Sequence, residues 1–358
     1  MKNIKAQNIL LLASLCTLLF LGGTATVFFP APQFSPQENR YLSTMPALTR
    51  NTLLTGEYTR SVDLYLAEHI PTRQFMREVR AATELSLGKC AVNGVLVCPD
   101  GRLIQLPTAN ERIRQQNLRL LATLQARAEE AQIPCTVSVL PEQASLTALL
   151  PNGYPVTPSG SDKALCSLLN NPDYWYRTDH HMTTDGAFVL YTHLGKSLDY
   201  KPYDMHQFSR TTVSDSFLGT GDAKAGVPWI RPDSITLYRY ENDLNYTVSK
   251  NGLPFPLTGL YDMEKLRTRD GYGVFLSGNH ALLEITRGVD DTRPVLLVIK
   301  DSYANTLLPF LAMHYRLLVV DPRYGSPDIT TLLTRADRML VLCGEGTLSV
   351  NFLSGIRL

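Results

Sequence analysis

The chain begins with a long apolar stretch and ends with short apolar runs that alternate with amphipathic stretches. Short, continuous apolar runs are typical of strands buried on both faces of a sheet. The sequence predicts such strands at Thr136–Leu140, Val295–Ile299, Arg316–Val320 and Met339–Cys343. It predicts helices at Asn110–Gln132, Tyr303–His314 and Ile329–Arg335. Strands separated by helices indicate an α/β fold with a parallel sheet that helices cover on both faces.

The region before these strands has a different pattern. Prolines between residues 30 and 50 predict an extended linker. Amphipathic stretches then predict helices over residues 55–70 and 71–87. The turn signal Pro99-Asp100-Gly101 lies between two apolar runs and predicts a hairpin. Residues 200–290 are rich in Gly, Thr and Tyr and are expected to be β-rich or irregular.

The N-terminal apolar run, about Ile9 to Phe29, is long enough to span a bilayer. Lys2 and Lys5 precede it and no lysine follows closely, which favours a cytoplasmic N-terminus and an exported remainder. The small residues Gly23-Thr24-Ala25 allow a second interpretation, a cleaved signal peptide. The length of the run favours an uncleaved anchor. We therefore expect an anchor or signal segment at 1–29, a linker, helices and hairpin at 30–105, and a catalytic domain at 106–358.

Composition argues against several classes of function. The 358 residues carry a formal net charge of +1, and the basic residues form no stripe with interleaved aromatics, so we expect no nucleic-acid partner. Six cysteines are present, of which Cys16 lies in the apolar run. Cys90 and Cys98 are close enough in sequence for a bridge, whereas Cys135 and Cys343 are equally well read as buried thiols. No Cys/His spacing suggests a structural zinc site, and we expect no cofactor.

Two of the seven histidines stand in the run Asp179-His180-His181-Met182-Thr183-Thr184-Asp185. A carboxylate beside a histidine can set its tautomer and stabilise its charged form. In an extended segment Asp179 and His181 share one side and His180 points to the other. A metal site through His180 and His181 is the weaker alternative, because adjacent histidines in a strand diverge. Capping of a following helix is a further alternative.

Ser302 follows the predicted strand Val295–Ile299 at a strand-to-helix turn. Ligands of open α/β sheets bind beyond the carboxyl ends of the strands. A serine there can act as a nucleophile if a base takes its proton, and N–H groups of the next helix could stabilise an oxyanion. The alternative is that Ser302 or Asp301 only caps the helix.

Six motifs occur in an order that resembles one known family. They are Glu38-Asn39-Arg40-Tyr41-Leu42, the hairpin Asn93-Gly94-Val95 with Asp100-Gly101-Arg102-Leu103-Ile104, Asp179-His180-His181, Phe275-Leu276-Ser277-Gly278-Asn279-His280, Lys300-Asp301-Ser302-Tyr303-Ala304-Asn305, and Asp321-Pro322-Arg323-Tyr324. The chain is similar to the DHHW family, named for its Asp-His-His-Trp motif. That family is related to the SGNH-like acyltransferase domains of alginate-type O-acetylation proteins.

The resemblance implies a three-layer α/β/α, SGNH-hydrolase-like sheet and a catalytic triad. Ser302 would be the nucleophile, His181 the general base and Asp179 the residue that orients it. Asn279 would donate to the oxyanion. We predict substrate contacts from Arg323, His180 and Tyr303; an ion pair between Arg323 and Asp321 is the alternative. The chain departs from the family at Met182, where the family has tryptophan, and at Ser277, where a second glycine is common.

The function expected from this resemblance is serine-dependent transfer of an acetyl group to a cell-surface or secreted polysaccharide. A membrane-bound O-acyltransferase would supply the acetyl group from the cytosolic side. One alternative is an esterase or deacetylase of such a polymer, with water as the acceptor. Another is a non-catalytic glycan-binding or assembly protein on an SGNH-like scaffold.

Overall fold

The computed structural model describes residues 2–28, 33–35, 40–70, 72–108, 110–157, 159–240, 246–254, 259–288 and 290–357. Residue 29, at the end of the predicted anchor, lies outside the described residues, and so do 30–32 and 36–39 of the predicted linker, which include Glu38 and Asn39 of the first motif. The chain divides into two compact units. The smaller contains residues 1–93 and 223–229, and the larger contains residues 94–222 and 230–358, so that the predicted hairpin belongs to the larger unit.

The smaller unit is mainly helical. Its elements are α1 (Lys2–Phe28), β1 (Phe34–Ser35), β2 (Arg40–Tyr41), α2 (Arg50–Leu54), α3 (Glu57–His69), α4 (Arg73–Ser86) and β3 (Ala91–Val92). Helices α3 and α4 agree closely with the two predicted from the sequence. Within α1, Asn8–Ala25 is long and apolar enough to cross a membrane, a property that signal sequences share.

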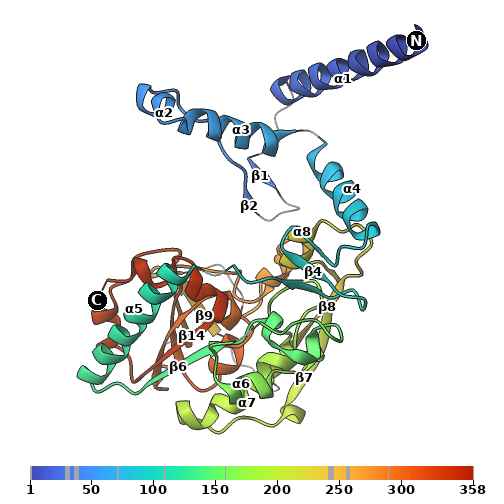
Figure 1. Cartoon of the computed structure of the whole chain (residues 1–358). Helices are drawn as coiled ribbons and strands as arrows, with labels where there is room; N and C mark the ends of the chain where they lie inside the picture. Colours follow the sequence, from blue (N-terminus) through green and yellow to red (C-terminus); the bar gives the residue numbers. More distant parts are fainter. Residues whose placement is uncertain are drawn as a thin grey trace. The chain divides into compact units, whose positions relative to one another are not determined.

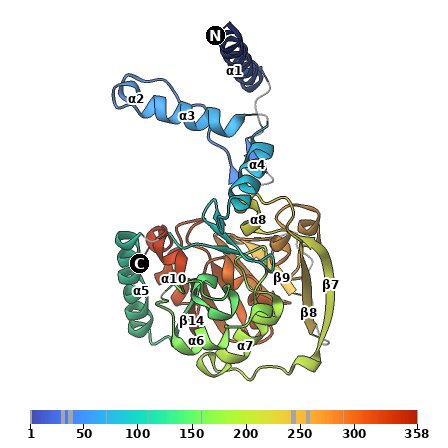
Figure 2. The ribbon, with the colours of Figure 1, turned by 45° about the vertical axis from the view of Figure 1, so that its right-hand side comes forward.

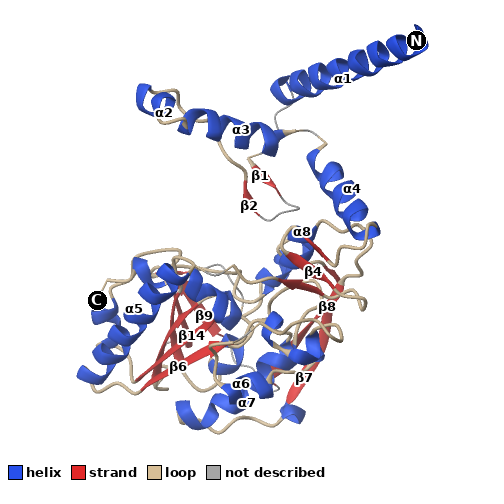
Figure 3. Cartoon of the chain, in the orientation of Figure 1, coloured by secondary structure: helices blue, strands red, loops and turns tan. Residues whose placement is uncertain are grey.

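The larger unit is built on a mixed sheet (Figures 1 and 3). Among the described residues, its strands lie in the order β10-β9-β11-β13-β12-β14-β6. They are β6 (Cys135–Leu140), β9 (Tyr246–Lys250), β10 (Leu253–Pro254), β11 (Leu282–Arg287), β12 (Val295–Lys300), β13 (Arg316–Val320) and β14 (Arg338–Gly344). The predicted strands at 136–140, 295–299, 316–320 and 339–343 are confirmed within one or two residues.

The expectation of a parallel sheet is correct for only part of it. Strands β13, β12, β14 and β6 are parallel, but β11 is antiparallel to β13 and to β9. Strands β9 and β10 form a hairpin through Asn251 and Gly252, which have φ values of 51° and 79°. Two left-handed residues of this kind make a tight turn, and a tight turn can join only antiparallel strands.

Helices contribute to two separate apolar clusters that share the sheet. Leu296 and Val298 of β12 pack in the cluster to which α7 (Thr184–Leu198) and α9 (Leu308–Leu311) contribute. Val295, Leu297 and Ile299 of β12 pack in the second cluster, to which α5 (Glu111–Glu130) and α10 (Ile329–Leu333) contribute. Because strand side chains alternate between faces, the two clusters lie on opposite faces of β12. The mixed α/β fold is thus confirmed.

Further elements lie outside this sheet. They are β4 (Val95–Val97), β5 (Leu103–Gln105), α6 (Lys163–Leu168), β7 (Phe208–Phe217), α8 (Thr220–Ala225) and β8 (Asp233–Tyr240). The predicted hairpin is β4 paired with β5, and the β-rich expectation for 200–290 is met by β7, β8 and β9 to β11. Figure 2 shows β7 and β8 as a long two-stranded ribbon at the side of this unit.

The helix predicted at Tyr303–His314 is shorter than expected. A single 3₁₀ turn covers Ser302–Ala304, and α9 begins only at Leu308. Pro309 explains the difference, because proline has no N–H to donate within a helix but fits well in a first turn. The N-terminal end of a long helix is therefore not available beside Ser302.

All six cysteines are free thiols. Cys98 and Cys343 are buried, Cys90 is exposed, and the bridge considered between Cys90 and Cys98 is not formed. Burial raises the pKa of the Cys343 thiol well above its ordinary value, as expected for an inert packing residue.

Candidate active site

Ser302 lies at the carboxyl end of β12, in the turn that its neighbour Asp301 holds in place. One oxygen of Asp301 accepts from the Tyr303 amide at 2.9 Å, and the other accepts from Gly344 N at 2.8 Å and Thr347 Oγ1 at 2.6 Å. Asp301 is therefore the cap, and it also ties this turn to the end of β14. Among the described residues, the Ser302 hydroxyl has no hydrogen-bond partner. It is half-buried and available for another contact.

A closed loop carries the histidine run. An isolated antiparallel bridge joins Trp175 to Met182, and Tyr176 N donates to His181 O at 3.2 Å. The carboxylate of Asp233 accepts from Thr178 N at 2.8 Å and holds the outer part of the loop. The side chains of residues 179–181 are therefore set by a loop that folds back on itself, not by an extended strand.

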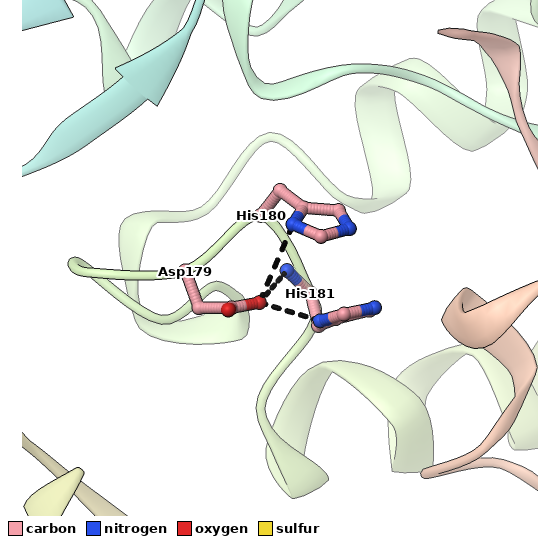
Figure 4. A group of neighbouring side chains, drawn as sticks. All are labelled: Asp179, His180 and His181. Carbon is pink, nitrogen blue, oxygen red and sulfur yellow. Dashed lines mark hydrogen bonds and ion pairs between the residues drawn. The ribbon is translucent and has the colours of Figure 1, made fainter. Parts of the chain in front are cut away.

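Asp179 and His181 are in direct contact within this loop (Figure 4). Oδ1 of Asp179 accepts from His181 Nδ1 at 2.5 Å and from the His181 backbone amide at 2.9 Å. A carboxylate only accepts, so Nδ1 carries the proton and Nε2 of the neutral ring is the basic atom. That Nε2 is sealed from solvent and has no partner among the described residues. An unpaired buried nitrogen of this kind is suited to taking a proton from a bound group.

The Asp179 carboxylate is held strongly in its charged form. Thr220 N and Oγ1 donate to Oδ2 at 2.6 and 3.0 Å, so both oxygens are occupied. Burial acts to raise the pKa of Asp179, but His181, His180 and the hydrogen bonds from His181 and Thr220 outweigh it. The pKa lies well below its ordinary value.

The expectation that His180 points away from His181 is wrong. The two rings lie 3.9 Å apart between centroids, and His180 Nδ1 is 3.6 Å from Asp179 Oδ1. The segment is bent, so the alternation of an extended strand does not apply. His180 Nδ1 also lies 2.6 Å from Thr220 Oγ1. Its ring stands edge-on to Tyr303 at 5.3 Å, at the border of the same site.

The ligand atoms of Asp179, His180 and His181 all lie within 4.8 Å of one another. The 2.5 Å contact between Asp179 and His181 Nδ1 is a hydrogen bond, which leaves no room for a cation between them. The group is better described as a hydrogen-bonded Asp-His pair than as a metal site.

Two glycines allow the segment 219–221 to reach this pair. A Cβ at position 219 would lie 2.3 Å from the Asp179 side chain, and one at position 221 would lie 2.7 Å from the Thr178 carbonyl. Only glycine fits at either position. Sequence reasoning missed Gly219, Thr220 and Gly221 because they lie about 40 residues from the loop they support and no local pattern connects them.

Tyr272 is a further residue that sequence reasoning missed, and it lies between the histidine and the serine turn. Its ring stacks on His181 at 3.9 Å with planes 8° apart. Its hydroxyl donates to the Ser302 carbonyl at 3.1 Å and lies 2.6 Å from Thr306 Oγ1. The structure therefore brings His181 and Ser302 to the same side chain, although no hydrogen bond joins His181 Nε2 to Ser302 Oγ.

Asn279 lies on a loop with an unusual backbone. Leu276, Ser277 and Gly278 have consecutive φ values of 57°, 59° and 91°. A left-handed conformation costs about 1–2 kcal/mol for a residue other than glycine, which explains why glycine suits position 277. Strain of this kind is found where a backbone must present a functional group. The Asn279 amide oxygen accepts from Lys300 Nζ at 2.8 Å and from Asn305 Nδ2 at 3.1 Å.

Arg323 and Tyr303, the remaining predicted substrate contacts, both interact with other parts of the protein. Arg323 forms a two-point ion pair with buried Asp321, at 2.9 Å from Nε and 2.7 Å from Nη2, in agreement with the alternative to a substrate contact. Tyr303 is only 6% exposed, and its ring fills the space where a side chain at Gly344 would lie. The Tyr303 ring also lies beside the rings of His180 and His181, with centroids 5.3 and 5.4 Å away.

Met182 lies in the hydrophobic core, with none of its surface exposed. It pairs with Trp175, whose indole is also buried and donates to the Leu169 carbonyl at 2.9 Å. The exchange of the family's tryptophan for methionine is therefore a change of core packing. It does not remove a side chain from an open pocket.

These features agree with the comparisons with known proteins. The DHHW family model matches residues 164–320. This match spans the histidine run and the Ser302 turn, and it confirms the resemblance proposed from the motifs. No curated protein matches the chain.

Solved structures show the same fold. A DHHW family protein from Eubacterium siraeum is similar over 73% of this chain and 94% of its own, with 18% identity and a TM-score of 0.61. Bacillus cereus PatB1, solved with a sulfonyl adduct, is similar over 74% of this chain and 100% of its own, with 17% identity and a TM-score of 0.56. At these identities the likeness shows the DHHW-type fold and nothing more.

Proposed function

We propose that the protein is a serine-dependent O-acyltransferase that moves an acetyl group to a polysaccharide outside the cytoplasm. One observation supports this most. A buried Asp179–His181 pair leaves His181 Nε2 without a partner, and the turn that carries Ser302 contacts the same tyrosine that His181 stacks on. This is the set of groups that activates a serine.

The proposed first half-reaction acylates Ser302. As Ser302 Oγ attacks the carbonyl carbon of the acetyl donor, His181 Nε2 takes the hydroxyl proton and Asp179 stabilises the imidazolium. The tetrahedral oxyanion accepts a hydrogen bond from Asn279 Nδ2. Collapse breaks the bond to the donor oxygen, which leaves with the proton from His181. Serine and histidine approach each other on binding, since catalytic hydrogen bonds are often long without substrate.

In the second half-reaction a sugar hydroxyl gives its proton to His181 Nε2 and attacks the acetyl-serine. Ser302 regains a proton as it leaves. We propose that α1 anchors the chain and that the larger unit acts on the far side of the membrane. A membrane-bound O-acyltransferase would then deliver the acetyl group, because acetyl-CoA is cytosolic. With water in place of the sugar hydroxyl, the same steps describe an esterase or deacetylase.

The test is the variant Ser302→Ala in the full-length protein, with an acetylated chromogenic ester as donor and added oligosaccharide. Wild type should release the chromophore and acetylate the oligosaccharide, and Ser302→Ala should lose at least about 10³-fold in rate. A sulfonyl fluoride should modify Ser302, read by mass spectrometry of the peptide. Free acetate as the sole product would replace transfer with hydrolysis. Equal rates in the two proteins would reject catalysis by Ser302.

The Tyr272 hydroxyl offers a smaller prediction. Tyr272→Phe keeps the ring stacked on His181 but removes the hydrogen bond to the Ser302 carbonyl. We expect kcat to fall about tenfold, corresponding to the roughly 1–1.5 kcal/mol of one hydrogen bond. Tyr261→Phe is the matched control, because its hydroxyl donates to the Tyr238 carbonyl at 2.8 Å. Steady-state rates of the two variants should therefore differ; equal losses in both would mean that Tyr272 acts only on stability.

A further inference from the structure

Lys300 is a buried cation that the steps above do not use. It is the last residue of β12, and it is 1% exposed. Its Nζ donates to Asn279 Oδ1 at 2.8 Å and to Asn305 Oδ1 at 2.6 Å, and it lies 3.7 Å from Asp321 Oδ2. Burial lowers the pKa of Lys300 to about 8, and the attraction of Asp321 opposes this shift. A buried ammonium group is unfavourable unless it is paired and hydrogen-bonded, as Lys300 is here.

The contacts of Lys300 determine which way two amides face. An ammonium group has donors and no acceptor, so each amide must present its oxygen to Nζ. The Asn279 oxygen accepts a second bond, from Asn305 Nδ2. The NH₂ group of Asn279 must therefore point away from Lys300, and it has no partner among the described residues.

We infer that Lys300 is a positioning residue that holds the Asn279 amide with its N–H groups toward the reaction oxyanion. This inference rests on the proposed function. Asn305 takes part because its side-chain oxygen accepts from the same ammonium group. It follows Ser302 by three residues, and its backbone N–H donates to the Ser302 carbonyl at 3.2 Å. Lys300 thereby links the Asn279 loop to the turn that carries Ser302, through its hydrogen bonds to Asn279 and Asn305.

The role follows from what an unrestrained amide would do. Without the ammonium, the Asn279 side chain can turn by 180° and present its carbonyl oxygen to the developing negative charge. Such a turn replaces an attractive dipole by a repulsive one in the transition state and leaves ground-state binding nearly unchanged. The expected signature is a lower kcat at constant KM.

Lys300→Met removes the ammonium group without leaving a charged partner unpaired. Methionine has a similar length, and Asp321 keeps its two-point contact with Arg323, so no buried carboxylate is left unpaired. We expect kcat for the chromogenic ester to fall about 10- to 100-fold, with KM within about twofold. Lys300→Gln retains a neutral donor and should lie between wild type and Lys300→Met, which covers the case in which methionine impairs folding.

A double variant shows whether Lys300 acts through Asn279. The rate of Asn279→Ala/Lys300→Met should lie within about threefold of that of Asn279→Ala alone, since the amide to be positioned is already absent. Arg335→Met, which removes an exposed ion pair with Glu284, is the control for loss of a cation and should retain the wild-type rate. Thermal melting measures folding in each case.

The outcomes separate the two proposals. A wild-type kcat in folded Lys300→Met, or multiplied losses in the double variant, would overturn the positioning role and leave the proposed function in place. Equal rates for wild type and Ser302→Ala would overturn the proposed function, and the role of Lys300 with it. A reduced kcat at constant KM, with no further loss in the double variant, supports the role.

Discussion

Replacing His181 with asparagine is expected to lower kcat about 10²- to 10⁴-fold, the usual contribution of a general base. Asparagine retains an N–H near the position of Nδ1 and can still donate to Asp179, but it has no counterpart of Nε2. The variant thus removes the basic atom and preserves the buried hydrogen bond at 2.5 Å. Single-turnover acylation of Ser302, followed with the chromogenic ester, measures the loss directly.

The same substitution at the neighbouring residue is the control. His180 lies beside Asp179 and Thr220, and its ring is 3.9 Å from that of His181, so distance alone does not decide between them. The asymmetry is in the hydrogen bonds: Asp179 accepts from His181 at 2.5 Å and lies 3.6 Å from His180. We expect His180→Asn to retain at least a tenth of the wild-type rate. A larger loss there than in His181→Asn would transfer the base role to His180.

The part of the fold that the sequence predicts well is the part with continuous apolar runs. Strand β12 is buried along its whole length, and β13 and β14 are buried after their first residues, so local composition is enough to find them. The direction of β9 and β11 could not be predicted in the same way, because strand direction depends on connections and not on apolar pattern. The apolar pattern after Ser302 continues through Pro309, so it predicts a longer helix than the one that forms.

The site shows the same division between local and distant information. Asp179 and His181 are two residues apart, so their contact could be anticipated, although the bent loop that produces it could not. Tyr272 and Thr220 come from segments tens of residues away, and only the folded chain shows that they meet the pair. The structure also changes the interpretation of Met182, because a side chain that is buried in the core gives little information about the substrate.

Asp179→Asn is expected to damage both catalysis and folding. Among the described residues, all four groups that hydrogen-bond to the carboxylate are donors, two at each oxygen. Whichever way the new amide turns, its NH₂ faces a backbone N–H, of His181 or of Thr220. A buried donor left without an acceptor costs about 1–3 kcal/mol. The histidine also loses the group that selects its tautomer, and in a serine protease the equivalent change lowers kcat about 10⁴-fold.

The control for Asp179→Asn is Asp185→Asn in the same segment. Asp185 accepts from Arg210 and Tyr238, its side chain is 39% exposed, and water can replace what is lost. Asp185→Asn should keep its rate and its melting temperature.

The stability that Asp179 contributes should depend on pH. Because the Asp179 pKa is depressed in the fold, its ionised form stabilises the protein above the ordinary carboxyl pKa of about 4, and this stabilisation is lost as the pH falls further. The difference in unfolding free energy between wild type and Asp179→Asn should therefore be constant above about pH 5 and shrink below pH 4. A difference that instead grew as the pH fell would mean that Asp179 is protonated in the folded protein and does not orient His181 as a carboxylate.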